Sequence, residues 1–429
     1  MNLNYSETIE FLYNSLPVFH RIGGAAYKAS LNNTLRLDEY FDHPHKKFKT
    51  IHIAGTNGKG SVSHMLASVL QAAGYRTGLY TSPHLKDYRE RIRVDGKEIA
   101  EDDVVNFIEQ HMKILDEVRP SFFEMSVAMA FDYFARMEVD IAVIEVGMGG
   151  RLDSTNIIKP LLSVITNISL DHTQFLGKTI SEIAGEKAGI IKPGVPVVIG
   201  ETQLETTNVF LEKAGEGASQ IYFADQKYSA FILEVNAHCQ NFELTDLKGN
   251  KFILQADLLG SYQKKNIVTV YTALLELMKH FPKLNAETIH AGIREAALNT
   301  GLRGRWEILH YNPLVICDTA HNEAGLKIVT EQLEKMTFRE LHFVFGTVKD
   351  KDPENVLSIL PKNARYYFTR AEIPRALDEQ SLEKAAGRFG LKGKAYPTVK
   401  LAIESAKKQA SGDDLIFIGG SNFVVAEAL

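Results

Sequence analysis

The residues best suited to chemistry form a glycine-rich stretch with one lysine, GTNGKGS at 55–61. It lies between an apolar run at 51–54 and an amphipathic pattern at 61–73, so a strand, a loop and a helix are expected in that order. Glycines let a backbone wrap phosphate oxygens, N–H groups at a helix start donate to them, and Lys59 adds a positive charge. Because Gly60 separates this lysine from Ser61, the stretch is a variant of the common phosphate loop. We predict that it binds phosphate and is not a plain glycine turn.

Three further polar side chains follow other apolar runs of the sequence. Ser82 comes after the run at 77–80, where its hydroxyl either binds Mg²⁺ or belongs to a proline-initiated turn, and the residue types leave this open. Glu145 lies in the apolar run 141–146, where burying an unpaired carboxylate is costly, and this favours a metal ligand. His172 follows the run at 162–167, but magnesium prefers oxygen, so spacing alone favours a hydrogen-bonded loop histidine.

The position of these features argues for a shared site. The phosphate loop, Ser82, Glu145 and His172 each follow the carboxyl end of an expected parallel strand. In an open α/β sheet these ends line one crevice, where ligands bind. The sequence therefore predicts nucleotide and metal binding along one edge of a sheet.

Expected strands and helices alternate along the first part of the chain, which predicts βαβ units and a mainly parallel sheet. Expected helices are 61–73, 122–137 and 180–190, and expected strands are 51–54, 77–80, 141–146, 162–167 and 195–199. Ser6 is expected to cap a first helix that Pro17 ends, followed by a glycine-containing loop at 19–28. Residues 222–258 alternate around a Lys-Gly-Asn turn at 248–250 and predict an antiparallel ribbon appended to the sheet. The charged pair Glu186 and Lys187 is expected on a solvated helix surface.

The alternation pauses at NTGLRGR, residues 299–305, and then resumes with expected strands at 314–317, 341–345, 366–369 and 415–418. We predict an α/β protein: a phosphate-loop-type, mostly parallel-sheet ATP-binding domain at 1–298, then a smaller Rossmann-like α/β domain at 299–429. In the second domain, Asp318, His321 and Asn322 follow a strand. Arg305, at the boundary, either reaches phosphates or is a surface charge.

The composition is that of an ordinary globular protein, with 45% hydrophobic and 24% charged residues. The formal charge of -5 argues against a general nucleic-acid binder. Cys239 and Cys317 lie in no metal or redox spacing and favour a reducing compartment. The sequence contains no recognisable secretory signal and no bilayer-spanning run, so we expect a soluble cytoplasmic protein without nucleic-acid or membrane partners.

Taken together, the motifs resemble the folylpolyglutamate synthase/dihydrofolate synthase family, within the Mur-ligase-like ATP-dependent amide ligases. The matching stretches run in order over most of the chain, and the ordered set is far more specific than any one of them. They are GTNGKGS at 55, TSPHL at 81, SFFEMS at 121, EVGMGGRLDSTN at 145, NISLDH at 167, EKAGIIKPG at 186, GRWE at 304 and DTAHN at 318.

The resemblance implies a ligase that joins L-glutamate to dihydropteroate, to the γ-carboxylate of (tetrahydro)folate, or to both, through an acyl phosphate. It implies that ATP binds between the two domains with two Mg²⁺ ions. The implied ATP ligands are Asn57, Gly58, Lys59, Gly60, Ser61, Asn266, Arg305 and Asp318. Ser82 and Glu145 would hold one Mg²⁺ ion, and Glu145 and His172 the second.

The resemblance also implies roles for residues that spacing alone does not single out. Lys187 matches a lysine that the family carries as a carbamate, which requires a neutral amine and is favoured by partial burial. With Lys59 and with His321, which would lie near the site of glutamate addition, it completes the implied catalytic set. The pterin- or folate-binding loops of bifunctional members resemble Ser121, Phe122, Phe123, Glu124, Leu152, Asp153 and Ser154, which favours a bifunctional enzyme.

The chain departs from the family pattern at Tyr262, where the family usually has histidine, and the loop at 21–24 is only loosely similar. Two rival hypotheses remain. A cell-wall Mur ligase would carry a sizeable nucleotide-sugar domain ahead of its phosphate loop, which here begins at Gly55. A non-catalytic ATP-sensing module would have no use for clustered metal-type ligands. We expect a monomer that binds only small-molecule substrates.

Overall fold

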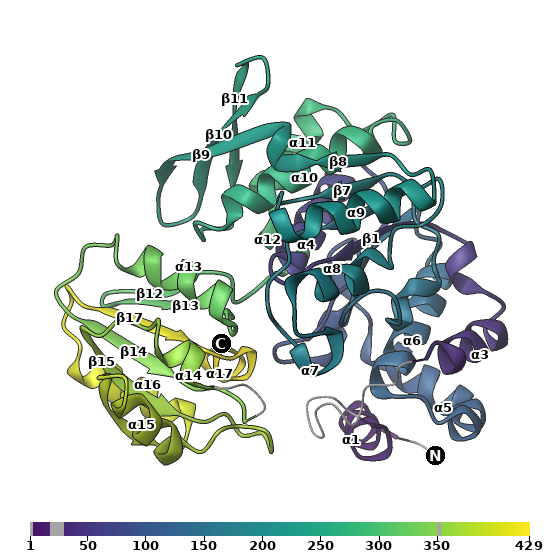
Figure 1. Ribbon diagram of the computed structural model, residues 1–429. Coiled ribbons are helices and arrows are strands. Elements are labelled where there is room, and N and C mark those ends of the chain that lie inside the picture. Colours follow the sequence, from purple (N-terminus) through teal and green to yellow (C-terminus); the bar gives the residue numbers. More distant parts are fainter. Residues whose placement is uncertain (1–2, 18–29, 350–352) are drawn as a thin grey trace. The chain divides into compact units, whose positions relative to one another are not determined.

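The computed structural model describes residues 3–17, 30–349 and 353–429, so the predicted loop at 19–28, with its segment 21–24, lies outside the described residues. The chain forms two compact units, Met1–Asp257 with Gln263–Leu302, and Leu258–Tyr262 with Arg303–Leu429 (Figure 1). The short stretch Leu258–Tyr262 joins the second unit because Leu259 packs in the apolar core of that unit. The predicted domain limits at 298 and 299 stay a prediction, and the compact units meet in sequence at Leu302 and Arg303.

The first unit is built on a sheet with the order β4-β3-β2-β5-β1-β6-β7-β8. In this order, the six strands β2, β5, β1, β6, β7 and β8 pair in parallel, whereas β3 and β4 add an antiparallel edge. The prediction of a mainly parallel sheet is confirmed. The strands are β1 (Lys49–Ala54), β2 (Thr77–Tyr80), β3 (Ile92–Val94), β4 (Lys97–Glu98), β5 (Ile141–Glu145), β6 (Leu162–Ile165), β7 (Val197–Ile199) and β8 (Ile221–Phe223).

The helices of the first unit bury apolar faces against this sheet and against one another. They are α1 (Tyr5–Ser15), α3 (Asn32–Tyr40), α4 (Lys59–Ala72), α5 (Glu101–Val118), α6 (Phe122–Arg136), α7 (Thr173–Leu176), α8 (Ile180–Ala188), α9 (Leu204–Glu216), α10 (Gln263–Leu277), α11 (Ala286–Arg294) and α12 (Ala296–Thr300). The predicted cap of α1 was wrong: Asn4, not Ser6, caps this helix, in a reciprocal pair with Glu7.

The predicted antiparallel ribbon is present as a three-stranded sheet of its own. It consists of β9 (Tyr228–Val235), β10 (Gln240–Asp246) and β11 (Lys251–Ala256). The expected turn lies between β10 and β11. The ribbon was expected to extend the main sheet, but only β8, at the start of the predicted stretch, does so. The ribbon instead packs against α10, where the ring of Tyr271 meets those of Tyr228 and Phe252.

The second unit contains a six-stranded sheet with the order β12-β13-β17-β14-β15-β16, parallel except for the edge strand β12. This confirms the predicted α/β class of the second half. The strands are β12 (Glu307–Tyr311), β13 (Leu314–Cys317), β14 (Leu341–Phe345), β15 (Ala364–Thr369), β16 (Lys392–Tyr396) and β17 (Leu415–Gly419). The helices are α13 (Glu323–Leu333), α14 (Pro353–Leu357), α15 (Glu379–Gly387), α16 (Val399–Gln409) and α17 (Asn422–Ala428). Over the described parts of the chain, no helix is both long and apolar enough to cross a membrane.

Candidate active site

The glycine-rich stretch lies between β1 and the first turn of α4, as the sequence predicted. Gly58 precedes this helix with a φ of 88°, a backbone conformation that residues other than glycine rarely adopt. Lys59 folds back over the loop, and its Nζ donates to the carbonyl oxygens of Gly55 at 3.0 Å and Thr56 at 3.2 Å. The helix start and this amine together form the kind of cradle that binds phosphate.

The loop is fixed from the side by the segment that follows β6. The N–H of Asn57 donates to Oδ1 of Asn167 at 3.0 Å, and the hydroxyl of Thr166 donates to the carbonyl oxygen of Asn57 at 2.6 Å. The hydroxyl of Thr56 both donates to the carbonyl oxygen of Ser169 and accepts from its N–H. These bonds explain why the motif at 167–172 accompanies the phosphate loop, a structural role that the sequence analysis did not assign.

Helix α10 lies against the same loop. A Cβ added to Gly58 would come within 2.4 Å of Oδ1 of Asn266, so this position admits only glycine. Asn266 in turn donates to Gln263, whose amide donates to the hydroxyl of Ser61 at 3.2 Å. The structure therefore brings Asn266 to the phosphate loop, although the two lie far apart in sequence.

The surroundings of Lys187 differ from those predicted from the residues alone. Its side chain was predicted on a solvated surface, but it is 4% exposed and its Nζ donates to the carbonyl oxygen of Gly55 at 2.9 Å. Burial and the nearby charge of Lys59 lower the pKa of Lys187 to about 7. Its neighbour Glu186 does face the surface region, where it pairs with Arg151 at 2.8 Å. The two residues differ because successive helix positions point in different directions.

The predicted metal ligands follow neighbouring parallel strands. β2 pairs with β5, β5 with β1 and β1 with β6, so Ser82, Glu145, the phosphate loop and His172 lie at or after the ends of four strands in a row. Glu145 ends β5 and is 4% exposed, and His172 precedes α7 with a φ of 50°. A hydroxyl, a buried carboxylate and an imidazole fit a divalent cation with oxygen and nitrogen ligands.

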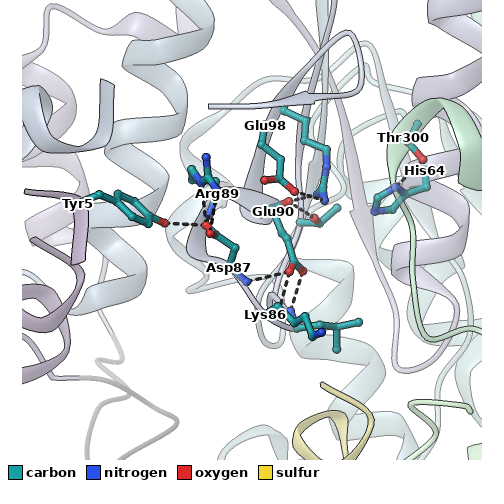
Figure 2. Close-up of polar contacts among 11 residues, drawn as sticks. Tyr5, His64, Lys86, Asp87, Arg89, Glu90, Glu98 and Thr300 are labelled. Carbon is teal, nitrogen blue, oxygen red and sulfur yellow. Dashed lines mark hydrogen bonds and ion pairs between the residues drawn. The ribbon is translucent and has the colours of Figure 1, made fainter. Parts of the chain in front are cut away.

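The loop that carries Ser82 is tied down by two acidic side chains (Figure 2). The carboxylate of Glu90 accepts the N–H groups of Leu85 at 2.7 Å, Lys86 at 2.8 Å and Asp87 at 2.9 Å. Asp87 binds Arg89 and accepts the hydroxyl of Tyr5 from α1 at 2.6 Å. The conformation of this loop therefore depends on its own carboxylates and on the first helix.

The motif SFFEMS begins α6. Ser121 and Glu124 form a capping box, in which each side chain accepts the backbone N–H of the other. Phe122 stacks on Tyr13 with ring centroids 5.3 Å apart, and Phe123 lies so close to Gly147 that a Cβ there would come within 2.4 Å of its ring. Serine followed three residues later by glutamate is a capping signature that the sequence already contained, and it gives these two residues a structural role.

The second stretch predicted to bind pterin follows β5. Asp153 is buried and its carboxylate accepts the N–H groups of Met148 at 2.9 Å and Thr155 at 3.0 Å, so it closes the glycine-rich turn after Glu145. Burial raises the pKa of this carboxyl. Ser154 is also buried, whereas Leu152 is half-buried.

In the second unit, the motifs GRWE and DTAHN are bonded to each other. The N–H and hydroxyl of Thr319 donate to the carbonyl oxygen of Gly304, and Arg305 donates to the same hydroxyl. Asp318 is 3% exposed and accepts the N–H of Trp306 at 2.8 Å. His321 lies beyond, with Nδ1 2.9 Å from the carbonyl oxygen of Thr319.

A separate cluster of Glu340, His342 and Asp414 in the second unit also has metal-type residues. It surrounds the beginnings of β14 and β17, the opposite ends of the strands from Asp318. Arg339 already pairs with Asp414 at 2.9 Å and Arg365 with Glu340 at 3.0 Å. Because each of these two carboxylates is already paired with a guanidinium group, the cluster has little free charge for a cation.

Comparison with known proteins agrees with this arrangement. The family model of the Mur ligase middle domain matches residues 53–274, and that of the Mur ligase, glutamate ligase domain matches residues 304–422. The dihydrofolate synthase/folylpolyglutamate synthase of Bacillus subtilis is 34% identical over 93% of this chain and 94% of its own length. The chain belongs to the folylpolyglutamate synthase/dihydrofolate synthase family.

A second relative is about twice as long as this chain. The probable bifunctional folylpolyglutamate synthase/dihydropteroate synthase of Haloferax volcanii is 34% identical over 99% of this chain but over 50% of its own length. The chain thus spans about half of that protein.

Solved structures of family members share the fold over nearly the whole chain. A Mycobacterium tuberculosis folylpolyglutamate synthase complexed with ADP gives a TM-score of 0.87 at 31% identity, covering 99% of this chain and 97% of that one. The FolC protein of E. coli in complex with DHPP and ADP gives 0.83 at 27% identity, covering 100% and 97%. A bifunctional folylpolyglutamate synthase/dihydrofolate synthase with Mn, AMPPNP and L-glutamate bound gives 0.84 at 27%, covering 100% and 97%. This folylpolyglutamate synthase/dihydrofolate synthase family member is an ATP-dependent ligase.

Proposed function

We propose that the protein joins L-glutamate both to dihydropteroate and to the γ-carboxylate of a reduced folate, with ATP as co-substrate. The observation that carries this proposal is the meeting of Lys59 and Lys187 at the carbonyl oxygen of Gly55, 3.0 and 2.9 Å away. Lys59 supplies the positive charge of an anion site at the start of α4, the amine of Lys187 from α8 lies beside it, and the buried Glu145 ends β5, the strand next to β1. Relatives whose structures hold ADP, AMPPNP and L-glutamate support the same chemistry here.

In the proposed reaction, the γ-phosphoryl group of ATP passes to a carboxylate oxygen of the acceptor, giving an acyl phosphate and ADP. The α-amine of glutamate then attacks the acyl carbon and loses a proton, and the C–O bond to phosphate breaks as the amide forms. Lys59 and the N–H groups of the loop would stabilise the charge on the transferred group. Asn57, Gly58, Gly60, Ser61 and Asn266 would hold the phosphates, and Arg305 and Asp318 would take part in nucleotide binding.

The metal assignment belongs to the same proposal. Ser82 and Glu145 would bind one Mg²⁺ ion, and Glu145 and His172 a second. Such ions neutralise phosphate charge and fix the geometry of transfer. Lys187, buried and with a pKa of about 7, has the neutral amine that carbamate formation needs.

The acceptor would lie near the loops that begin α6 and follow β5. Phe123 offers half-buried aromatic surface, the buried Phe122 would support this loop from the core, and Ser121, Glu124, Asp153 and Ser154 shape the backbone around them. Leu152 is the half-buried member of this set. His321 would contribute to glutamate addition. We further propose a cytoplasmic monomer whose partners are these small molecules.

The deciding experiment measures ADP release by purified protein with Mg-ATP and glutamate, using dihydropteroate and tetrahydrofolate as separate acceptors. Turnover with both establishes the bifunctional reaction, and turnover with one assigns a single activity. If neither acceptor is turned over, the proposal is overturned in favour of an ATP-sensing module.

A matched pair of variants checks that the turnover comes from this site. Lys59→Ala should lower turnover at least about a hundredfold, the scale of one lost contact to the transition state. Lys49→Ala, which removes an exposed lysine at the beginning of β1, should leave it within about twofold. Full activity of the Lys59 variant would contradict the role of the loop.

A further inference from the structure

Asp318 is a buried carboxylate that depends on neighbouring donors. Its Oδ2 accepts the hydroxyl of Tyr262 at 2.6 Å and the N–H of Trp306 at 2.8 Å, and its Oδ1 accepts the N–H of Ala320 at 2.7 Å. Burial raises the pKa of Asp318, whereas the bond from Tyr262 and the charge of Arg305 lower it. Removing the tyrosine hydroxyl would therefore leave this carboxylate less firmly oriented and easier to protonate.

Tyr262 is itself held in place within the second unit. It ends the short stretch Leu258–Tyr262, in which Leu259 is packed in the core and the N–H of Ser261 donates to Oε1 of Gln332 at 2.7 Å. Burial raises the pKa of Tyr262 well above its usual value, so the phenol remains a donor. Among the described residues, the other titratable groups that act on Tyr262 are Arg305 and Cys317, and burial keeps the thiol of Cys317 neutral by raising its pKa.

We propose that Tyr262 is a positioning residue for nucleotide binding, acting through Asp318. Its hydroxyl fixes one edge of the carboxylate and favours the ionised form, so that Oδ1 stays directed toward a hydroxyl or amino donor of the nucleotide. This inference rests on the proposed role of Asp318 in nucleotide binding. It assigns a purpose to the position at which the sequence departs from the family pattern, because a phenol carries its donor further from the backbone than an imidazole does.

The test is calorimetric titration of the full chain with ADP at pH 8 and pH 6. We expect Tyr262→Phe to weaken ADP binding about tenfold at pH 8, the scale of a hydrogen bond to a charged group. The ratio to the wild type should be larger at pH 6, because the variant's carboxylate protonates more readily. Tyr396→Phe is the matched control, since it also removes one hydrogen bond of a tyrosine hydroxyl in this unit, to Ser405 at 2.8 Å. It should leave the ADP affinity unchanged at both pH values.

A double variant separates positioning from packing. In the Asp318→Asn background, adding Tyr262→Phe should weaken ADP binding by less than about twofold, because the carboxylate on which the hydroxyl acts is gone. Trp306, beside Asp318, reports by its fluorescence whether the second unit of each variant is folded. Unchanged ADP affinity in Tyr262→Phe, or the same loss at both pH values, would overturn the inference.

Binding of ADP requires no acceptor, so the two proposals fail separately. Wild-type protein that binds ADP but turns over neither acceptor would sink the proposed reaction and leave the role of Tyr262 to be decided by the affinities. Wild-type protein that does not bind ADP would overturn the inference as well.

Discussion

Two lysine side chains meet at one carbonyl oxygen of the phosphate loop, and their environments differ. Lys59 is half-buried, whereas Lys187 is 4% exposed, and its pKa falls to about 7 through burial and through the charge of Lys59. An amine with this pKa is uncharged in a large fraction of molecules near neutral pH, and only the uncharged form reacts with CO₂. At the scale of single residues, the fold thus gives this lysine a pKa well below the ordinary value.

We expect Lys187 to carry a carbamate above about pH 7 and to lose it below, because the protonated amine cannot add CO₂. With ¹³C-labelled bicarbonate, a carbamate signal should be visible by NMR at pH 8 and absent at pH 6. Lys187→Arg should remove the signal and lower turnover about 10- to 100-fold, as when support of a metal site is lost. Lys192→Arg is the control, since Lys192 is another lysine with a lowered pKa, and it should keep the signal. A signal that persists in Lys187→Arg would contradict this assignment.

At the scale of elements, the site is assembled from loops that follow parallel strands. The sheet places these loops side by side, but their shapes are set by local acceptors such as Glu90, which receives three backbone N–H groups (Figure 2). Capping at the start of α6 has the same effect on SFFEMS. Several motif residues therefore act on the backbone of these loops and hold it in position.

Removing the acceptor side chain of Glu90 should loosen the loop that carries Ser82. We expect Glu90→Ala to accelerate amide hydrogen exchange at 85–87 and to raise the Mg²⁺ concentration needed for half-maximal activity about tenfold. The cause is the loss of three charge-assisted bonds, which together contribute about 1–3 kcal/mol at a partly exposed site. Glu101→Gln, which alters a single contact to Arg89 at 3.4 Å, is the control. Unchanged exchange at 85–87 would show that the loop holds its shape without this carboxylate.

The whole molecule contains separate cores in its two units. The single tryptophan, Trp306, belongs to the second unit, so its fluorescence follows the unfolding of that unit alone. His52 lies buried in β1 of the first unit, with Nε2 2.8 Å from the hydroxyl of Thr155. Burial lowers the pKa of His52 to about 3, so the folded first unit contains a neutral imidazole.

Acid should destabilise the first unit through His52. Its folded pKa lies below the unfolded value of about 6.5, so the unfolded state binds more protons between these values and stability is lost as pH falls below about 6.5. The contribution is about 1.4 kcal/mol per pH unit. His52→Gln should flatten this pH dependence in urea unfolding followed by circular dichroism, while the Trp306 transition stays unchanged.

The exposed His280 gives a matched control for this measurement. His280→Gln should retain the pH dependence of the wild type. An equally steep acid transition in His52→Gln would show that another group governs the acid stability of the first unit.

Much of the fold was predictable because it depends on local pattern. The strands β13 and β14 were predicted with the bounds that the structure has, and the place of the loops after parallel strands followed from alternating apolar runs. The order of these strands in the sheet was not predicted. Less predictable were β12 and β16, whose half-exposed residues give a weak apolar signal. The ribbon was recognised by its turn, but its packing on α10 was not, because nothing in a hairpin specifies the surface that covers it.

By itself, the sequence determined which residues are available for chemistry and which strand ends carry them, because motif spacing and strand periodicity are short-range properties. The tertiary structure alone decided that Lys187 is buried against Gly55, 132 residues away, and that Tyr262 holds Asp318 across 56 residues. The surroundings of a polar side chain depend on surfaces that long-range packing brings together. Its pKa and its partners, and with them its chemical role, are therefore properties of the folded chain.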